Sequence, residues 1–130
     1  MAITEAVENY LETILILSKE QPDVHAIDIC SYLGYSRPTV SIVLKKMKEN
    51  GLVLVDGDNH ITLTEKGRDV AEHIYDRHNV LSELFMLLGV SRDNAVEDAC
   101  KIEHDLSDET YSVLKSYYFR LRNNNGGKND

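Results

Sequence analysis

The segment from Ala26 to Lys48 constrains the fold most strongly, because it has the pattern of two short helices joined by a glycine-containing turn. The first helix, over residues 26–33, ends at Gly34, a residue that tolerates the left-handed conformation of a helix terminus. The second begins with Ser36 as its N-cap and Pro38 in its first turn, where a missing amide N–H costs nothing. This pattern predicts a helix-turn-helix, the unit whose second helix enters the major groove of DNA.

A β-hairpin is predicted directly after these helices. Gly51 ends the second helix, and two β-rich runs follow, Leu52–Val55 and His60–Leu63. The intervening residues 56–59, Asp-Gly-Asp-Asn, suit a tight turn. A hairpin in this place is a wing, so we expect residues 1–66 to form a winged helix-turn-helix DNA-binding domain. Its loop is acidic, and we expect it to bind phosphate weakly and to contribute little.

The rest of the chain carries helical periodicity. Apolar residues recur at helical spacing in one helix before the helix-turn-helix and in three helices after the wing. These run from about Thr4 to Lys19, from Thr64 to about Leu88, from a cap at Ser91 to about Ile102, and from Ser107 to about Leu121. We therefore expect a mainly α chain in which residues 67–122 form a second, helical domain. The Asn- and Gly-rich residues 123–130 have nothing to bury, and we expect a disordered tail there.

Charge is unevenly distributed along the chain. Its 130 residues carry a formal net charge of −8, which by itself argues against nucleic acid, because lysine and arginine supply most of the non-specific affinity for phosphates. Residues 36–48, however, contain one arginine and three lysines and no acidic residue. We therefore expect one basic patch on an otherwise acidic body.

Eight residues of the second helix are candidate DNA contacts. Those in its first turns carry short side chains that can reach phosphates or base edges, together with one arginine that can reach phosphate or guanine. The lysines further along would mostly meet phosphates. The set is Ser36, Arg37, Pro38, Thr39, Ser41, Lys45, Lys46 and Lys48. The alternative interpretation is a packing module for protein contacts, which has no need of four cations without an anion.

Neither the cysteines nor the N-terminus indicates export. Cys30 and Cys100 are both embedded in apolar helical patterns and do not form the disulfide framework of a small secreted domain. The first five residues lack the basic start of a signal peptide, and no apolar stretch approaches the ~20 residues that span a bilayer. We expect a cytoplasmic protein with reduced thiols and no membrane association.

A group of possible metal ligands lies near the end of the predicted second domain. Cys100, Glu103 and His104 are spaced i, i+3 and i+4, which places a thiol, a carboxylate and an imidazole on one helical face. Spacing alone is a modest signal, because a buried cysteine is usually just a small hydrophobic residue. His78 in the long helix and Glu12 in the first helix are further candidates. Their default interpretations are a satisfied core histidine and a solvated carboxylate.

Three segments resemble, in the same order, the diphtheria-toxin-repressor family of iron- and manganese-dependent regulators. They are Glu8-Asn9-Tyr10-Leu11-Glu12-Thr13-Ile14, Tyr75-Asp76-Arg77-His78 and Cys100-Lys101-Ile102-Glu103-His104-Asp105-Leu106-Ser107. The resemblance covers about Ala6 to Phe119. It is specific, because the motif spacing, the winged-helix pattern and the Glu-His-x-Leu-Ser ending agree in order.

The resemblance implies six metal ligands. In that family a residue of the first helix, a histidine of the long helix and a ligand helix form paired metal sites. The matching positions here are Asn9, Glu12, His78, Cys100, Glu103 and His104. Asn9 departs from the pattern, because the manganese branch has aspartate there and the iron branch methionine. A neutral amide offers only its carbonyl oxygen.

This ligand set combines features of both branches of the family. Cys100 stands where the iron branch has cysteine and the manganese branch glutamate, whereas Glu12 matches the manganese branch. Since a thiolate favours softer metals, we expect Fe(II) first and Mn(II) next, with Zn(II) or Co(II) binding in vitro. The iron branch's ancillary site uses a histidine and a glutamate where this chain has Val96 and Ser82. A second site of that type would be weakened, or rebuilt through Glu12 or the neighbouring Glu83.

The resemblance implies a metal-dependent transcriptional repressor without catalytic activity. The helices after the wing would form a homodimer, so that two recognition helices address the half-sites of a palindromic double-stranded DNA operator, with the metal as corepressor. Metal-uptake genes would be its targets, and its length is that of the short, two-domain type. The alternative is a winged-helix regulator that senses a small organic ligand or a protein partner and needs no metal.

Overall fold

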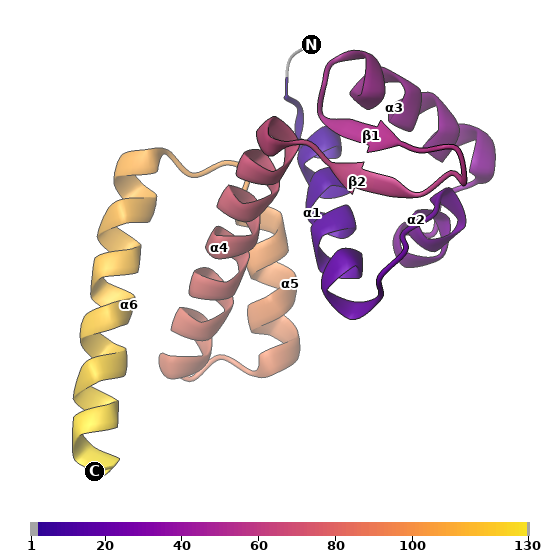
Figure 1. The fold of residues 1–130 in the computed structure, drawn as a ribbon. Helices are drawn as coiled ribbons and strands as arrows, with labels where there is room; N and C mark the ends of the chain where they lie inside the picture. The colour runs from indigo at the N-terminus through magenta and orange to yellow at the C-terminus, as the bar shows by residue number, and fades with distance from the viewer. Residues whose placement is uncertain (1–2, 130) are drawn as a thin grey trace. The chain divides into compact units, whose positions relative to one another are not determined.

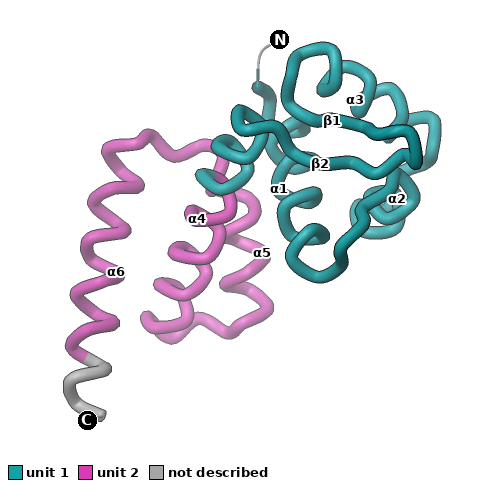
Figure 2. The backbone as a smooth tube through the Cα atoms, in the orientation of Figure 1, with its two compact units in different colours: residues 1–73 teal, residues 74–130 magenta. Residues whose placement is uncertain are grey.

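The computed structural model describes residues 3–129, with side chains through residue 124. The chain is mainly helical, as predicted (Figure 1). Its elements are α1 (Glu5–Glu20), α2 (Ala26–Leu33), α3 (Arg37–Glu49), β1 (Val53–Val55), β2 (Ile61–Leu63), α4 (Glu65–Leu87), α5 (Arg92–Ile102) and α6 (Asp108–Asn129). They divide into two compact units, residues 1–73 (unit 1) and residues 74–130 (unit 2), coloured separately in Figure 2.

Unit 1 is a winged helix-turn-helix, which confirms the sequence prediction. Gly34 ends α2 with a φ of 73°, in the left-handed region that favours glycine. Ser36 caps α3 as predicted, its side chain accepting a hydrogen bond from the Thr39 amide. Strands β1 and β2 pair antiparallel, with Val53 opposite Leu63. Helix α1 contacts α2 and β2, and its Leu11 is completely buried.

The start of α4 is held against the beginning of the wing, within unit 1. The Thr64 hydroxyl donates to the carbonyl oxygen of Gly51 at 2.6 Å and accepts from the Gly67 amide at 3.0 Å. A Cβ atom at Gly67 would lie 2.0 Å from the backbone carbonyl oxygen of Leu52. Glycine at this position therefore permits an approach between two backbones that any side chain would prevent.

Unit 2 consists of the later part of α4 together with α5 and α6. One of its apolar clusters is formed by Val80, Leu84, Tyr111 and Tyr118, with Leu114 and Leu121 packed against it. Polar capping defines the ends of its helices, since Ser91 caps α5 by accepting from the Asn94 amide. No helix in the described part of the chain has the length and apolar character needed to cross a membrane.

Two boundaries differ from the sequence expectations. Helix α6 continues past Leu121 to Asn129, so residues 123–129 of the expected disordered tail are helical, and Asp130 lies outside the described residues. A helix that has been nucleated gains one hydrogen bond for each residue added, so it extends beyond the last buried side chain. Side chains after residue 124 lie outside the described set. The units divide within α4, after residue 73, rather than near residue 66, and the proposed domain limits of 1–66, 67–122 and 123–130 stay predictions.

Candidate metal centre

Three possible metal ligands meet in unit 2. His78 comes from α4, Cys100 from α5, and Glu103 is the C-cap residue of α5. The His78 Nδ1 atom lies 2.9 Å from Glu103 Oε2 and 3.6 Å from Cys100 Sγ. All three donor atoms lie within 4.8 Å of one another. The cluster thus joins residues that are far apart in the sequence.

Burial differs sharply among these residues. Cys100 is exposed, whereas Glu103 is only 1% exposed. His104 follows with a side chain that is 2% exposed, and its Nε2 atom lies 3.5 Å from Glu103 Oε1. The two carboxylate oxygens of Glu103 therefore each face one imidazole. A buried carboxylate needs such partners or a cation, because an isolated buried charge is strongly unfavourable.

The two remaining predicted ligands belong to unit 1. Asn9 and Glu12 lie on α1, and both are half-buried. The backbone carbonyl of Asn9 accepts a hydrogen bond from the Thr13 hydroxyl at 2.8 Å. The structure thus brings His78, Cys100 and Glu103 together with His104 beside them, while a role for Asn9 and Glu12 stays a prediction.

The donor set of unit 2 fits a divalent transition metal. Ligands that hold such an ion at about 2.0–2.3 Å lie roughly 3–4 Å from one another, which matches the separation of Cys100 Sγ from His78 Nδ1. The shorter separation between His78 and Glu103 is that of a hydrogen bond. A thiol, an imidazole and a carboxylate together suit iron, cobalt, nickel or zinc, and carboxylate and imidazole ligands also suit manganese.

The same contacts change the protonation of the histidine. Hydrogen bonds to Cys100 and to Glu103 raise the pKa of His78 to about 10, although burial opposes this. This pKa favours the doubly protonated imidazolium form of His78 at neutral pH in the metal-free protein. A metal ion that binds this nitrogen must displace the proton.

Sequence reasoning did not assign a role to Arg77, the neighbour of His78. Arg77 is 4% exposed, and it lies on the same buried face of α4 as Ile74 and Leu81. The signal was present in the sequence, because a cation interrupts the apolar positions of this helix at helical spacing.

A second group of donors, also unassigned from the sequence, lies in the wing. Atoms of Asp56, Asp58 and His60 lie within 4.8 Å of one another. Asp56 Oδ1 accepts hydrogen bonds from the amides of Asp58 and His60, at 2.9 and 3.0 Å, and the His60 bond is the main cause of a lowered pKa of Asp56. These bonds close the hairpin turn, which accounts for the cluster without a ligand.

The candidate DNA contacts all lie on the exposed side of unit 1. Each of the eight residues predicted on α3 is exposed, while Val40, Leu44 and Met47 of the same helix are buried. A groove of about 580 Å³ is lined by residues of α3, the wing and the start of α2. Arg37, Lys45 and Lys48 line one side of it. Helix α3 thus presents its cations to solvent, as a helix that meets phosphates requires.

Two family models match the chain, one in each half. The model described as "Iron dependent repressor, N-terminal DNA binding domain" matches residues 2–61. The model described as "Iron dependent repressor, metal binding and dimerisation domain" matches residues 64–129. Their order along the chain agrees with the positions of the winged helix and of the donor cluster.

Individual relatives agree with these matches. The chain is 31% identical to the transcriptional regulator MntR of Escherichia coli O157:H7 over 87% of this chain and 73% of that protein. It is 33% identical to the iron-dependent repressor IdeR of Mycobacterium tuberculosis (strain ATCC 25618 / H37Rv) over 82% of this chain and 47% of that protein. The solved structure of the manganese regulator SloR aligns with a TM-score of 0.74 at 30% identity, covering 90% of this chain and 54% of that one. The chain thus spans about half the length of the latter two proteins.

Proposed function

The chain belongs to the iron-dependent repressor family, and on that premise we propose that its His78, Cys100 and Glu103 cluster binds the metal that controls DNA binding by α3. Members of this family are metal-dependent transcriptional repressors rather than enzymes. This chain has both of the family's domains, one for DNA binding and one for metal binding and dimerisation, so its partners are a DNA operator and a second copy of itself.

The observation that carries this proposal is the meeting of three donors from α4 and the end of α5. His78, Cys100 and Glu103 would hold the ion directly, and His104 would join them through its Nε2 atom. Glu12 and Asn9 complete the donor set by resemblance to the family, which would link metal occupancy to the unit that carries α3. When bound, the ion supplies positive charge that compensates the buried Glu103 carboxylate.

Within this family the choice of metal depends on the donor types. The Cys100 thiol favours Fe(II), whereas the carboxylates of Glu103 and Glu12 also suit Mn(II). We therefore place Fe(II) first as corepressor and Mn(II) second, with Zn(II) and Co(II) as ions that bind in vitro. Metal-uptake genes are the proposed targets, and the cytoplasm, where the operator DNA is located, is the proposed compartment.

DNA recognition is assigned to α3. Its exposed Ser36, Arg37, Pro38, Thr39 and Ser41 would meet base edges and phosphates near the N-terminus of the helix. The lysines at positions 45, 46 and 48 would meet phosphates. A homodimer presents two copies of this helix, which fits a palindromic operator.

The proposal is tested by gel shifts on DNA from upstream of the protein's own gene. Binding is compared under reducing, anaerobic conditions in chelator, Fe(II), Mn(II) and Zn(II). We expect tight binding only with metal. Equally tight binding in chelator would contradict the corepressor role and would favour a regulator that needs no metal.

A substitution links that result to the donor cluster. Glu103→Ala is expected to remove the metal dependence of DNA binding and to weaken metal affinity about a hundredfold or more, while circular dichroism shows unchanged helicity. The matched control is Glu97→Ala on the same helix, an exposed residue whose partner is Lys101. Unchanged metal affinity in Glu103→Ala would remove this carboxylate from the site.

A further inference from the structure

Arg77 is the one strongly buried cation among the described residues, and it stands beside a proposed metal ligand. Its side chain is 5% exposed, and the next residue along α4 is His78. A buried guanidinium loses its hydration, so its charge needs partners within the protein. Arg77 finds these at its two Nη atoms, while its Nε atom is buried without a hydrogen-bond partner in the part of the chain that the structure describes. The groups that satisfy Arg77 therefore indicate what this residue holds in place.

The guanidinium binds three successive segments of unit 2. Its Nη1 atom donates to the carbonyl oxygens of Glu103 at 3.2 Å and Leu106 at 2.7 Å. Its Nη2 atom donates to Asp108 Oδ1 at 2.6 Å. The guanidinium carbon also lies 4.9 Å from the centre of the Tyr111 ring, on α6.

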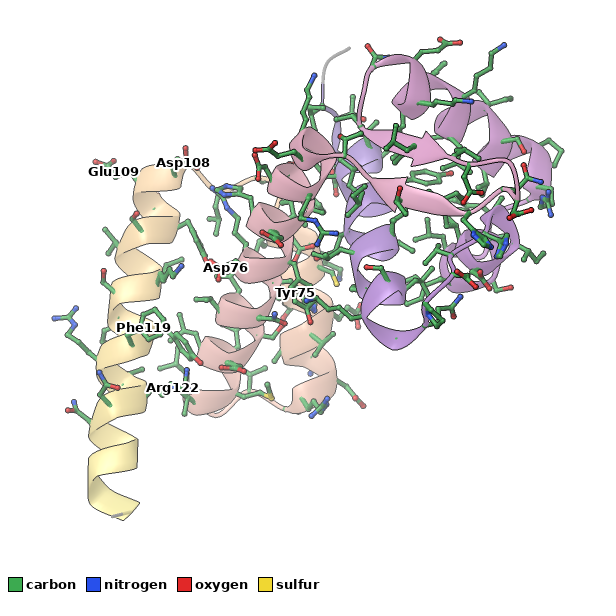
Figure 3. The ribbon with its side chains drawn as sticks, in the orientation of Figure 1. Tyr75, Asp76, Asp108, Glu109, Phe119 and Arg122 are labelled. Atoms are coloured by element: carbon green, nitrogen blue, oxygen red, sulfur yellow. The ribbon has the colours of Figure 1, made fainter. Side chains whose placement is uncertain are left out.

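One of these acceptors is a carbonyl that the end of a helix leaves without a partner, one is a carbonyl of the connecting turn, and the third is a carboxylate. Helix α5 ends at Ile102, and the carbonyls after it have no intrahelical donor. Glu103 is the C-cap, and its own carbonyl is one of the two that Arg77 binds. Asp108 is the first residue of α6. Arg77 thus joins the end of α5, the connecting turn and the start of α6, and Figure 3 labels Asp108 at that start.

Arginine suits this task and lysine does not. The guanidinium presents several donors in one rigid plane, so it can bind two carbonyls and a carboxylate at once. A lysine ammonium keeps the charge but lacks that geometry. Because Arg77 and His78 are consecutive on one helix, the same helical turn places the imidazole and the backbone of Glu103.

We propose that Arg77 is a positioning residue of the metal site. It fixes the backbone of Glu103 relative to His78. The Glu103 carboxylate, His78 Nδ1 and His104 Nε2 would then need no rearrangement to bind a metal ion. This inference rests on the proposed function and adds a determinant of metal affinity that does not itself touch the ion. Groups that orient direct ligands in this way typically alter affinity about 10- to 100-fold when substituted.

A neighbouring contact provides a control that also joins α4 to α6 but leaves the ligand turn alone. The Tyr111 hydroxyl donates to Asp76 Oδ2 at 2.5 Å, and Lys115 donates to the same oxygen at 2.9 Å. Tyr111→Phe removes the first of these bonds and keeps the ring beneath Arg77. It should therefore lower the thermal midpoint without changing metal affinity.

The experiment is an anaerobic titration of the full chain with Co(II), whose absorption reports thiolate coordination by Cys100. We expect Arg77→Lys to weaken Co(II) binding about 10- to 100-fold and to alter the thiolate-to-cobalt band, with helicity preserved. Tyr111→Phe should bind Co(II) like the wild type. Equal affinity in Arg77→Lys and wild type would overturn the positioning role, as would an equal loss in Tyr111→Phe.

Asp108→Asn keeps the test decisive if Arg77→Lys fails to fold. Asp108 has a side chain that is 89% exposed, so this change removes one charge from the guanidinium without disturbing a core. We expect a loss of Co(II) affinity of roughly two- to fivefold, since one of three hydrogen bonds is weakened. Wild-type affinity in this folded variant would overturn the proposal. A wild-type chain that fails to bind Co(II) would instead contradict the proposed function itself.

Discussion

The two units differ in what fills their interiors. In unit 1, the most completely buried residues are apolar, among them Leu11, Ile14 and Met47. In unit 2, buried apolar residues such as Leu81 and Leu84 are joined by Arg77 and Glu103. Among the described residues, the buried charged side chains thus belong to the metal-binding unit. Buried charged groups make its interior sensitive to protons and cations.

The largest expected effects come from matched core substitutions. Leu11→Ala in unit 1 and Leu84→Ala in unit 2 each remove a leucine that is at most 2% exposed. Each should lower the free energy of unfolding by about 2–5 kcal/mol in urea titrations. Ile42→Ala is the control, because Ile42 is 58% exposed and its loss should change stability little.

Repeating these titrations with Co(II) sharpens the comparison. An ion that binds only the native state stabilises it by about 2.7 kcal/mol at a hundredfold excess over its Kd. If Asn9 and Glu12 of α1 also bind the ion, Co(II) should raise the urea midpoints of unfolding of both Leu11→Ala and Leu84→Ala. A response confined to Leu84→Ala would remove these two residues from the site and would make metal binding a property of unit 2 alone.

The next effect is an alkaline pH dependence of the stability of unit 2. The pKa of His78 is raised to about 10, above its ordinary value of 6.5, because the charged imidazole is held by Cys100 and Glu103. In metal-free protein this contributes stability that is fully present below pH 6.5 and is lost as the pH rises through about 10. NMR titration of the His78 ring should give a midpoint near 10, and Glu103→Gln should lower it.

Metal affinity should increase with pH, whereas the contribution of His78 to the stability of the metal-free protein decreases. The ion displaces one proton from His78 and one from the Cys100 thiol. Apparent Co(II) affinity should therefore rise with pH, by about tenfold per unit for each proton released. Proton release measured by calorimetry in two buffers checks the same step. An ordinary imidazole midpoint near 6.5 would show that the His78 contacts are weaker than their distances indicate.

The smallest effects are expected at two equivalent helix caps. Ser36 caps α3 in unit 1 and Ser91 caps α5 in unit 2, each accepting an amide hydrogen bond at 3.4 Å. Replacement of either by alanine should lower the free energy of unfolding by about 1 kcal/mol. Only Ser36→Ala should also weaken operator binding, measured by fluorescence anisotropy. An equal loss of DNA affinity in Ser91→Ala would contradict the assignment of contacts to α3.

Much of the fold could be predicted because it is encoded locally. Ser36 and Ser91 mark helix starts, Gly34 marks a helix end, and the Asp-Gly-Asp-Asn run marks the hairpin. Each of these signals lies within a few residues of the feature it specifies. At the end of α6 the local signal was misleading, because the helix passes through the Asn- and Gly-rich residues 123–127, a composition typical of helix ends.

The metal centre could be predicted only in part, because it depends on contacts between helices. The spacing of Cys100 and Glu103 is a local property, and it placed them on one face. That His78 meets both of them depends on how α4 packs beside α5, which spacing cannot specify. The role of Arg77 is less predictable still, since its acceptors include backbone carbonyls, which are present at every residue.

The close approach at Gly67 limits how this protein can be recombined with its relatives. The backbone of Gly67 packs against the Leu52 carbonyl, so the first turn of α4 requires the chain that leads into the wing in this position. A hybrid that joins this DNA-reading unit to another repressor's metal-binding unit should therefore be spliced within α4 between Gly67 and Ile74, downstream of that contact. A junction at the end of the wing would place Leu52 and position 67 in segments from different proteins, and a side chain at position 67 would clash with the Leu52 carbonyl.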